Sequence, residues 1–152
     1  MKLIAKIISI NIGIMLKKVK RPFFIKGPFS NFEHSKDVSL DTDIICNINI
    51  EREKTADVIL TCKIGDLKGV NSPFQVDVTI IGNFKYNKDA SDGIAFENLL
   101  SPNAIAILYP YLRTTISTLT SLSNDFPTLN MPVINIAKMM EDHNLIEIKH
   151  FE

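Results

Sequence analysis

The chain has 152 residues, of which 45% are hydrophobic and 22% charged, and its formal net charge is zero. This size and composition are typical of one globular domain with a single core. Neutrality argues against binding to nucleic acid or anionic lipid through charge, so we expect no nucleic-acid partner. We also expect no membrane insertion, because the apolar run at the start of the sequence is too short to span a bilayer.

The first sixteen residues are largely apolar, but from Ile8 to Leu16 apolar and other residues alternate with a period of two. The run is too short to span a bilayer, Lys6 interrupts it, and no small-residue cleavage site follows. We therefore predict a strand over about residues 4–19 in place of a signal peptide. On this interpretation the chain remains in the cytoplasm.

Residues 22–43 follow neither the helical nor the strand period, and their prolines, glycine and short polar residues indicate a long connection. A loop of this length in a compact domain is usually functional or disordered. The loop is rich in aromatic residues, which either fill the edge of the core or form the apolar wall of a binding groove. These residues are Phe23, Phe24, Phe29 and Phe32.

Alternating apolar residues predict three further strands, at about residues 43–51, 57–65 and 73–86. A turn about position 54 pairs Ile50 with Val58, and a turn about position 69 pairs Cys62 with Val76. In this register the apolar residues of all three strands share one face. The sequence therefore predicts an antiparallel meander with a helix on its apolar face.

Apolar residues at spacings of three and four predict a long helix over about residues 103–123, and a short one is predicted over about residues 135–144. Pro110 should kink the long helix or mark a first turn just outside its regular part. The long helix is apolar on more than one side, so it needs more than one cover. We therefore expect a homo-oligomer.

The motifs of metal and catalytic sites are absent from the sequence. Cys46 and Cys62 lack metal-ligand spacing and should be buried free thiols. His34, His143 and His150 do not form a ligand pair on one helix face. Glycine-rich phosphate loops and nucleophile elbows do not occur either, so we expect no cofactor, no metal and no enzymatic activity.

Two runs in the C-terminal half resemble a known family. Pro102-Asn103 is followed by ILYPYLR, ending at Arg113, and then by FPTLNMPVIN from Phe126 to Asn135. Together they resemble the SecB protein-export chaperone signature, PxxLFPYxR followed by FPxLxLxPVNF. The meander, with FxVxV from Phe74 and a glycine at Gly82, is similar to that family as well.

The resemblance implies an α+β fold in which a four-stranded antiparallel sheet packs against one long and one short C-terminal helix, in a single domain over residues 1–152. It also implies a homotetramer that holds unfolded preproteins for export and delivers them to the translocase ATPase SecA. Asn135 would cap the short helix. Asp77, on the polar sheet face, occupies a position resembling a SecA contact.

Two sets of site residues follow from the resemblance. The expected client-binding groove lies between the aromatic loop and the short helix, because a holdase needs adaptable apolar side chains. Its residues are Phe23, Phe24, Phe29, Phe32, Ile136, Met139 and Met140. The expected oligomer interface comprises Tyr109, Tyr111, Leu112, Ile116 and Leu119.

Two other classes of function remain open. One is a SecB-like chaperone dedicated to a single partner, such as the antitoxin of a toxin-antitoxin system, which would bind that partner tightly and assorted unfolded proteins weakly. The other is a small-molecule carrier or enzyme, which would need a closed pocket with convergent polar groups.

Overall fold

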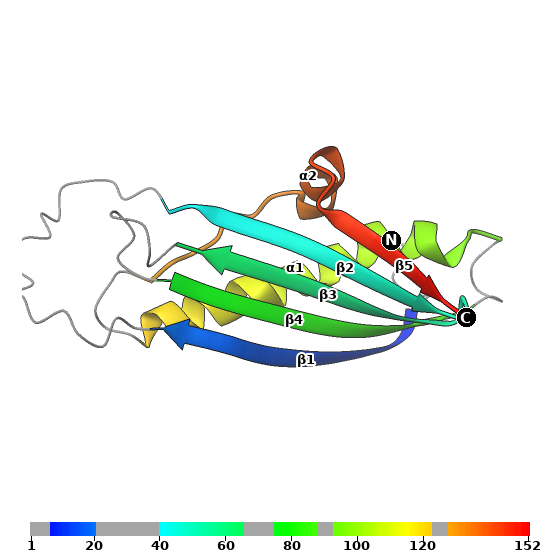
Figure 1. Cartoon of the computed structure of the whole chain (residues 1–152), viewed down its shortest axis with the longest axis horizontal. Coiled ribbons are helices and arrows are strands. Elements are labelled where there is room, and N and C mark those ends of the chain that lie inside the picture. The colour runs from blue at the N-terminus through cyan, green and yellow to red at the C-terminus, as the bar shows by residue number, and fades with distance from the viewer. Residues whose placement is uncertain (1–6, 21–39, 66–74, 88–92, 123–127) are drawn as a thin grey trace, which may run out of the picture.

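A curved sheet and a long helix form the framework of the molecule (Figure 1). The computed structural model describes the backbone of residues 7–20, and both backbone and side chains of residues 40–65, 75–87, 93–122 and 128–152. Four strands come first in the chain, two helices follow, and a fifth strand comes after them, as in an α+β fold. The elements are β1 (Ile7–Lys20), β2 (Thr42–Glu51), β3 (Thr55–Ile64), β4 (Gln75–Tyr86), α1 (Phe96–Ser121), α2 (Ile136–Asp142) and β5 (Ile146–Phe151).

The sheet has five strands in the order β1-β4-β3-β2-β5. The first four strands pair antiparallel, whereas β5 lies parallel to β2 at the edge. The prediction of a four-stranded, purely antiparallel sheet is therefore wrong, because the sheet is mixed and has one strand more. Only Ile146 and Ile148 give β5 an apolar alternation, which is too short a pattern to distinguish a strand from a tail.

The register of the meander differs by two residues from the predicted one. Ile50 is opposite Ala56 instead of Val58, and Cys62 is opposite Val78 instead of Val76. The turn after β2 explains the first shift, since Arg52 and Glu53 adopt left-handed φ angles of 47° and 52° and the Lys54 amide donates to Glu51 O at 3.0 Å. A shift of two residues keeps every side chain on its face, so the predicted apolar face is retained.

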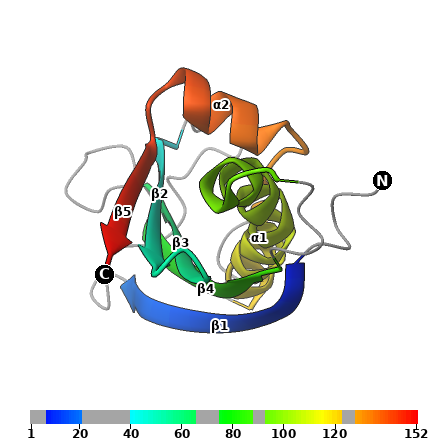
Figure 2. The same ribbon diagram turned by 90° about the vertical axis from the view of Figure 1, so that its right-hand side faces the viewer.

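The core lies between the inner face of the sheet and the two helices (Figure 2). Burial alternates strictly along β3, where every second residue from Ala56 to Ile64 is buried. The largest fully buried side chains are contributed by β2 to β4 and by both helices. They are Phe84, Ile48, Ile50, Leu60, Ile64, Ile80, Leu100, Ile105, Leu108, Leu112, Ile116 and Met140.

At Gly82 the side chain of Leu108 on α1 packs directly against β4. A Cβ atom at this position would lie 2.7 Å from Phe84 Cε2 and 2.8 Å from Leu108 Cδ2. Real Cβ atoms are essentially never found so close to other heavy atoms, so a larger residue would require the Phe84 ring or the Leu108 side chain to move. Glycine here lets Leu108 seat directly on the sheet.

The helix α1 begins at Phe96, earlier than the predicted start near residue 103, and runs through both Pro102 and Pro110. The early start extends a row of buried residues four apart that includes Phe96, Leu100 and Ala104. Both prolines are exposed, so the carbonyls they leave without an intrahelical partner lie on the side of α1 away from the core. Within the described residues, neither helix has the length and hydropathy needed to cross a membrane.

Candidate binding surface

Residues 128–135, here called the link, run back along α1 and are held to it by hydrogen bonds. The helix positions involved are three or four apart, so they form one line along α1. Successive link residues meet successively earlier helix residues, which makes the link antiparallel to α1. The bonds are Leu129 N to Thr120 Oγ1 (2.9 Å), Ser117 Oγ to Asn130 Oδ1 (3.0 Å), Arg113 Nε to Met131 O (2.9 Å) and Tyr109 OH to Pro132 O (2.9 Å).

Tyr109 and Arg113 hold the middle of the link. Burial raises the pKa of the Tyr109 phenol, and its hydroxyl donates a hydrogen bond to Pro132 O. The Arg113 guanidinium carbon lies 5.9 Å from the centre of the Tyr109 ring, which adds a cation–π contact. These contacts fix the backbone of the link immediately before Val133.

The short helix α2 starts where the sequence predicted. The Asn135 side chain accepts a hydrogen bond from Lys138 N at 3.2 Å, which confirms the predicted cap. Ile136 and Met140, two of the predicted groove residues, are 4% and 0% exposed and belong to the core, so they do not line an open groove in this structure. They are turned inward because α2 packs on α1 (Figure 2).

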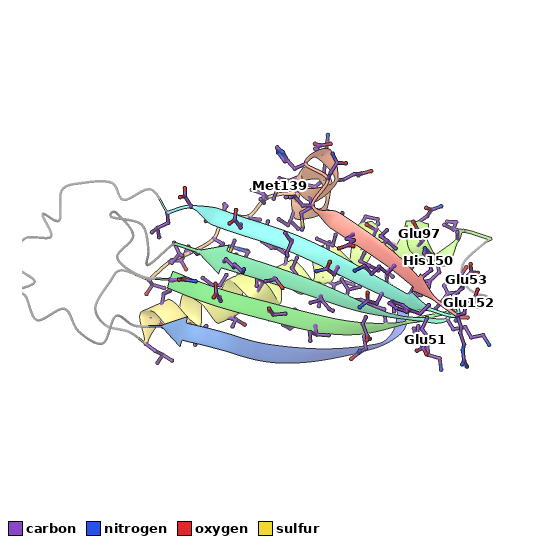
Figure 3. The ribbon with its side chains drawn as sticks, viewed as in Figure 1. Glu51, Glu53, Glu97, Met139, His150 and Glu152 are labelled. Carbon is purple, nitrogen blue, oxygen red and sulfur yellow. The ribbon has the colours of Figure 1, made fainter. Side chains whose placement is uncertain are left out.

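Apolar side chains are nevertheless exposed at the junction of the link and α2. Val133 is 83% exposed and Ile134 is 43% exposed. Met131 and Met139 are half-buried, and Met139 projects from α2 (Figure 3). We call these four residues the apolar junction. Flexible methionines beside branched aliphatic residues suit contact with varied apolar sequences.

Only one of the predicted client-binding residues, Met139, is thus at the surface among those the structure describes. The four loop phenylalanines, Phe23, Phe24, Phe29 and Phe32, lie outside the described residues. Val133 and Ile134 were missed because they sit inside a motif that was used to identify the family and not to locate the site. Their signal was available: two branched apolar residues between a proline and a helix cap have no strand or helix to bury them.

The long helix also places the predicted oligomer residues differently. Tyr109, Leu112 and Ile116, which were predicted to face another subunit, are 4%, 0% and 0% exposed and lie inside the single chain. They pack in the core because they face the sheet and the link. Leu119 is half-buried against the same core, whereas Tyr111 is 48% exposed.

The opposite side of α1 is exposed but has no charged residue. Glu97 and Arg113 are the charged residues of this helix, and the Arg113 side chain is directed to the link. A helix that faces water normally displays charged side chains there. We call this side of α1 the uncharged face; its exposed residues are Asn98, Pro102, Ala106, Pro110, Tyr111, Thr114 and Thr118.

Asp77 lies on the outer face of the sheet and is half-buried. Gln75 Nε2 donates to its carboxylate oxygens at 3.4 and 3.2 Å. Along the ladder its neighbours are Lys63 on β3 and Lys18 on β1. Lysines therefore occupy the positions on both sides of Asp77, and this part of the sheet is not an acidic patch.

The comparison with protein families places these features in context. The family model described as preprotein translocase subunit SecB matches residues 26–145. The chain belongs to the SecB family. The match includes the link and α2 but ends one residue before β5, so the SecB model does not cover that strand.

Two further comparisons add a relative and a similar fold. An uncharacterized protein of Methanocaldococcus jannaschii is 34% identical over 113 residues, which is 74% of this chain and 68% of that protein. The fold is similar to that of a SecB-like chaperone of Mycobacterium tuberculosis, solved in complex with a ChAD peptide from the HigA1 antitoxin. That match has a TM-score of 0.54 and 15% identity, and it covers 88% of this chain and 94% of the other.

Proposed function

We propose that this SecB-family protein is a chaperone that holds unfolded or pre-export polypeptides in the cytoplasm through the apolar junction. The observation that carries the proposal is the exposure of Val133 and Ile134 next to two half-buried methionines. Exposed apolar side chains cost solvation free energy, and grouped ones mark interaction sites more often than single ones do. The hydrogen bonds from α1 present this surface on a fixed backbone.

Supporting evidence comes from the family and from the Mycobacterium tuberculosis relative, which was solved with a polypeptide bound. Binding of a peptide by a relative with the same fold fits a surface made for polypeptide and not for a small molecule. The four loop phenylalanines remain part of the proposed client surface. We expect them to extend the apolar junction, since aromatic and methionine side chains adapt to many sequences.

The test is a refolding assay with a slow-folding preprotein and an equimolar amount of the oligomer. The wild-type protein should delay refolding, and Ile134→Ser should weaken the delay. Ile45→Ser on the outer sheet face is the matched control, because Ile45 is 46% exposed and Ile134 is 43% exposed. Equal behaviour of both variants and the wild type would show that the apolar junction does not bind clients.

A second candidate is a chaperone dedicated to one partner, such as an antitoxin. It is favoured by the antitoxin peptide with which the SecB-like chaperone of Mycobacterium tuberculosis was solved. Binding isotherms for several unfolded proteins and for one antitoxin tail would separate the two. A general chaperone should bind all of them with similar affinity, whereas a dedicated one should bind one partner at least about 100-fold more tightly, or about 2.7 kcal/mol.

Delivery to SecA is the least supported step of the proposal. An acidic contact acts through its charge, and Lys63 occupies the ladder position beside Asp77 on β3. If SecA docks on this face, Asp77→Lys should weaken its binding while the refolding delay is kept. If SecA binding to the wild type is absent, the chaperone passes clients on without it.

A homo-oligomer, and a tetramer by analogy with the family, completes the proposal. The uncharged face of α1 is the surface we assign to subunit contact, in place of the buried Tyr109, Leu112 and Ile116. Small and uncharged residues let two helices approach closely without burying a charge. Tyr111 and Leu122, 48% and 70% exposed, would add apolar area to that contact.

A further inference from the structure

The strand β5 forms one edge of the sheet, and half of its backbone groups point away from β2. Cys46 N donates to Leu145 O at 2.9 Å and Arg52 N donates to Phe151 O at 3.0 Å, so the odd-numbered residues face β2. In a parallel pair alternate residues bond to the partner strand. The N–H and C=O groups of Ile146, Ile148 and His150 therefore point outward. In the described part of the chain, β5 is the last strand of the sheet on this side.

The side chains of β5 are divided between the two faces of the sheet. Ile146 and Ile148 are half-buried and pack on the core, and His150 Nε2 lies 3.0 Å from Glu97 Oε2 at the start of α1 (Figure 3). Glu147 and Lys149 lie on the outer face with a nitrogen–oxygen distance of 3.2 Å, and their side chains are 60% and 56% exposed. One acidic and one basic residue are thus two positions apart beside a backbone edge that no other described strand covers.

We propose that β5 pairs antiparallel with β5 of a second copy of this chain, across a twofold axis at Ile148. In this register the outward amides and carbonyls of both strands are satisfied. Glu147 stands opposite the partner's Lys149 on the outer face, and this contact occurs twice. Ile148 meets the partner's Ile148 on the inner face. The two sheets join into one, through an interface distinct from the uncharged face of α1.

The charges select this register over its neighbours. Because outward residues must face outward residues, the strands slide in steps of two. One step in one direction puts Glu147 opposite the partner's Glu147, and one step in the other puts Lys149 opposite the partner's Lys149. Like charges directly opposite each other are destabilising. Charged residues on an edge strand normally discourage pairing, but this pattern of charges is complementary to its own reversed copy.

The same charge pattern favours a second copy of this chain, and not an arbitrary client strand, as the partner of the β5 edge. A client would satisfy the backbone groups, yet only a chain with opposite charges in reverse order would satisfy Glu147 and Lys149 as well. The inference does not depend on chaperone activity, because the pairing uses β5 alone. A protein without client binding could form this contact, and a working chaperone could lack it.

Cysteine trapping in the full chain tests the register directly. Opposite residues of a non-hydrogen-bonded pair have Cα atoms about 4.5 Å apart, within disulfide range, whereas diagonal neighbours are about 7–8 Å apart. Glu147→Cys mixed with Lys149→Cys should therefore give a covalent dimer on mild oxidation. Either variant alone should give at least roughly 5-fold less, since its cysteines are diagonal across the twofold axis. Lys149→Cys mixed with Lys85→Cys, an exposed position on β4, is the matched control for random collision.

Charge reversal provides the second arm. Glu147→Lys and Lys149→Glu should each weaken the contact roughly 10-fold or more, because both ion pairs become like-charge pairs. Mixing the two variants should restore it, since lysines of one chain then face glutamates of the other. The ion pair within each chain is not restored by mixing, so recovery reports the contact between chains.

Sedimentation measures the association, and circular dichroism confirms that each variant is folded. The proposal is overturned if the mixed cysteine variants give no more dimer than the control pair. It is also overturned if mixing the charge variants restores nothing, or if a cysteine in β5 is captured by a client peptide in preference to a second copy.

Discussion

The two sides of α1 are both free of unpaired charge, yet one is core and the other is exposed. On the inner side Leu100, Leu108 and Leu112 are at most 1% exposed and contact the sheet. On the uncharged face, Ala106 and Thr114 are exposed without a lysine or glutamate beside them. The comparison shows that two uncharged sides of one helix can have different roles, because only one of them is buried within the chain. The inner side specifies the fold, and the uncharged face is available to specify assembly.

Shortening Leu108 should give the largest effect, because it tests the inner side where α1 meets Gly82. Leu108 is 0% exposed and seats where a Cβ on Gly82 would clash. Leu108→Ala should lower the free energy of unfolding by about 2–5 kcal/mol, since the cavity cannot fully collapse. Denaturant unfolding measures the loss. The matched control is Ile107→Ala, one position along the helix and only half-buried, which should cost less than half as much. Equal losses of unfolding free energy in the two variants would mean that burial does not distinguish Leu108 from Ile107.

A charge on the uncharged face should break assembly and spare the fold. Thr114 is exposed in the single chain, so Thr114→Glu leaves the core intact. In a contact between subunits the carboxylate would be buried without a partner, which should weaken association by about 2 kcal/mol, or roughly 30-fold. Sedimentation equilibrium measures the shift, and Thr55→Glu at an exposed end of β3 is the control. Unchanged association of Thr114→Glu would remove α1 from the interface.

Removing the Tyr109 hydroxyl should lower stability by a smaller amount and should mainly affect the link. Tyr109→Phe keeps the buried ring and loses the 2.9 Å bond to Pro132 O. We expect a loss of about 0.5–1.5 kcal/mol in unfolding free energy. Faster amide exchange at Val133 and Ile134 should accompany it, because the bond holds the backbone beside them. Thr115→Ala is the control, since its hydroxyl bonds Tyr111 O within the same helix at 2.8 Å. If exchange in the link is equally fast in both variants, Tyr109 does not hold it.

The sequence predicted the features of the fold that follow a regular residue period. Alternation predicted the strands and the face that each residue occupies, as at Ile48 and Leu60, because a strand has a fixed period of two. It did not predict the register, since pairings two residues apart bury the same side chains. The turn at Arg52 and Glu53 decides that register through backbone angles that are not typical of either residue.

The site was harder to predict than the fold. Periodicity showed that α1 is apolar on more than one side, but not which residues of Tyr109, Tyr111 and Leu112 face the sheet. That depends on where the helix begins and on how Gly82 seats Leu108. Met139 was predicted from the preference of holdases for methionine, whereas Val133 was not, because its exposure depends on the path of the link.

The two cysteines give the smallest effect at neutral pH and test the inner face of the sheet. Burial raises the pKa of Cys46 and of Cys62 from 9.0 to about 12. Both should therefore react with a thiol reagent at pH 8 far more slowly than in the denatured chain, because the thiolate is the reactive form.

Above pH 9 the unfolded chain releases thiol protons that the folded chain keeps. Stability should then fall with rising pH, by about 1.4 kcal/mol per unit for each thiol up to the folded pKa. Unfolding of Cys46→Ala and Cys62→Ala across this range should show a shallower slope than the wild type. Rapid labelling of the native protein would mean that the inner face of the sheet becomes accessible without global unfolding. Packing of α1 would then not protect that face from solvent.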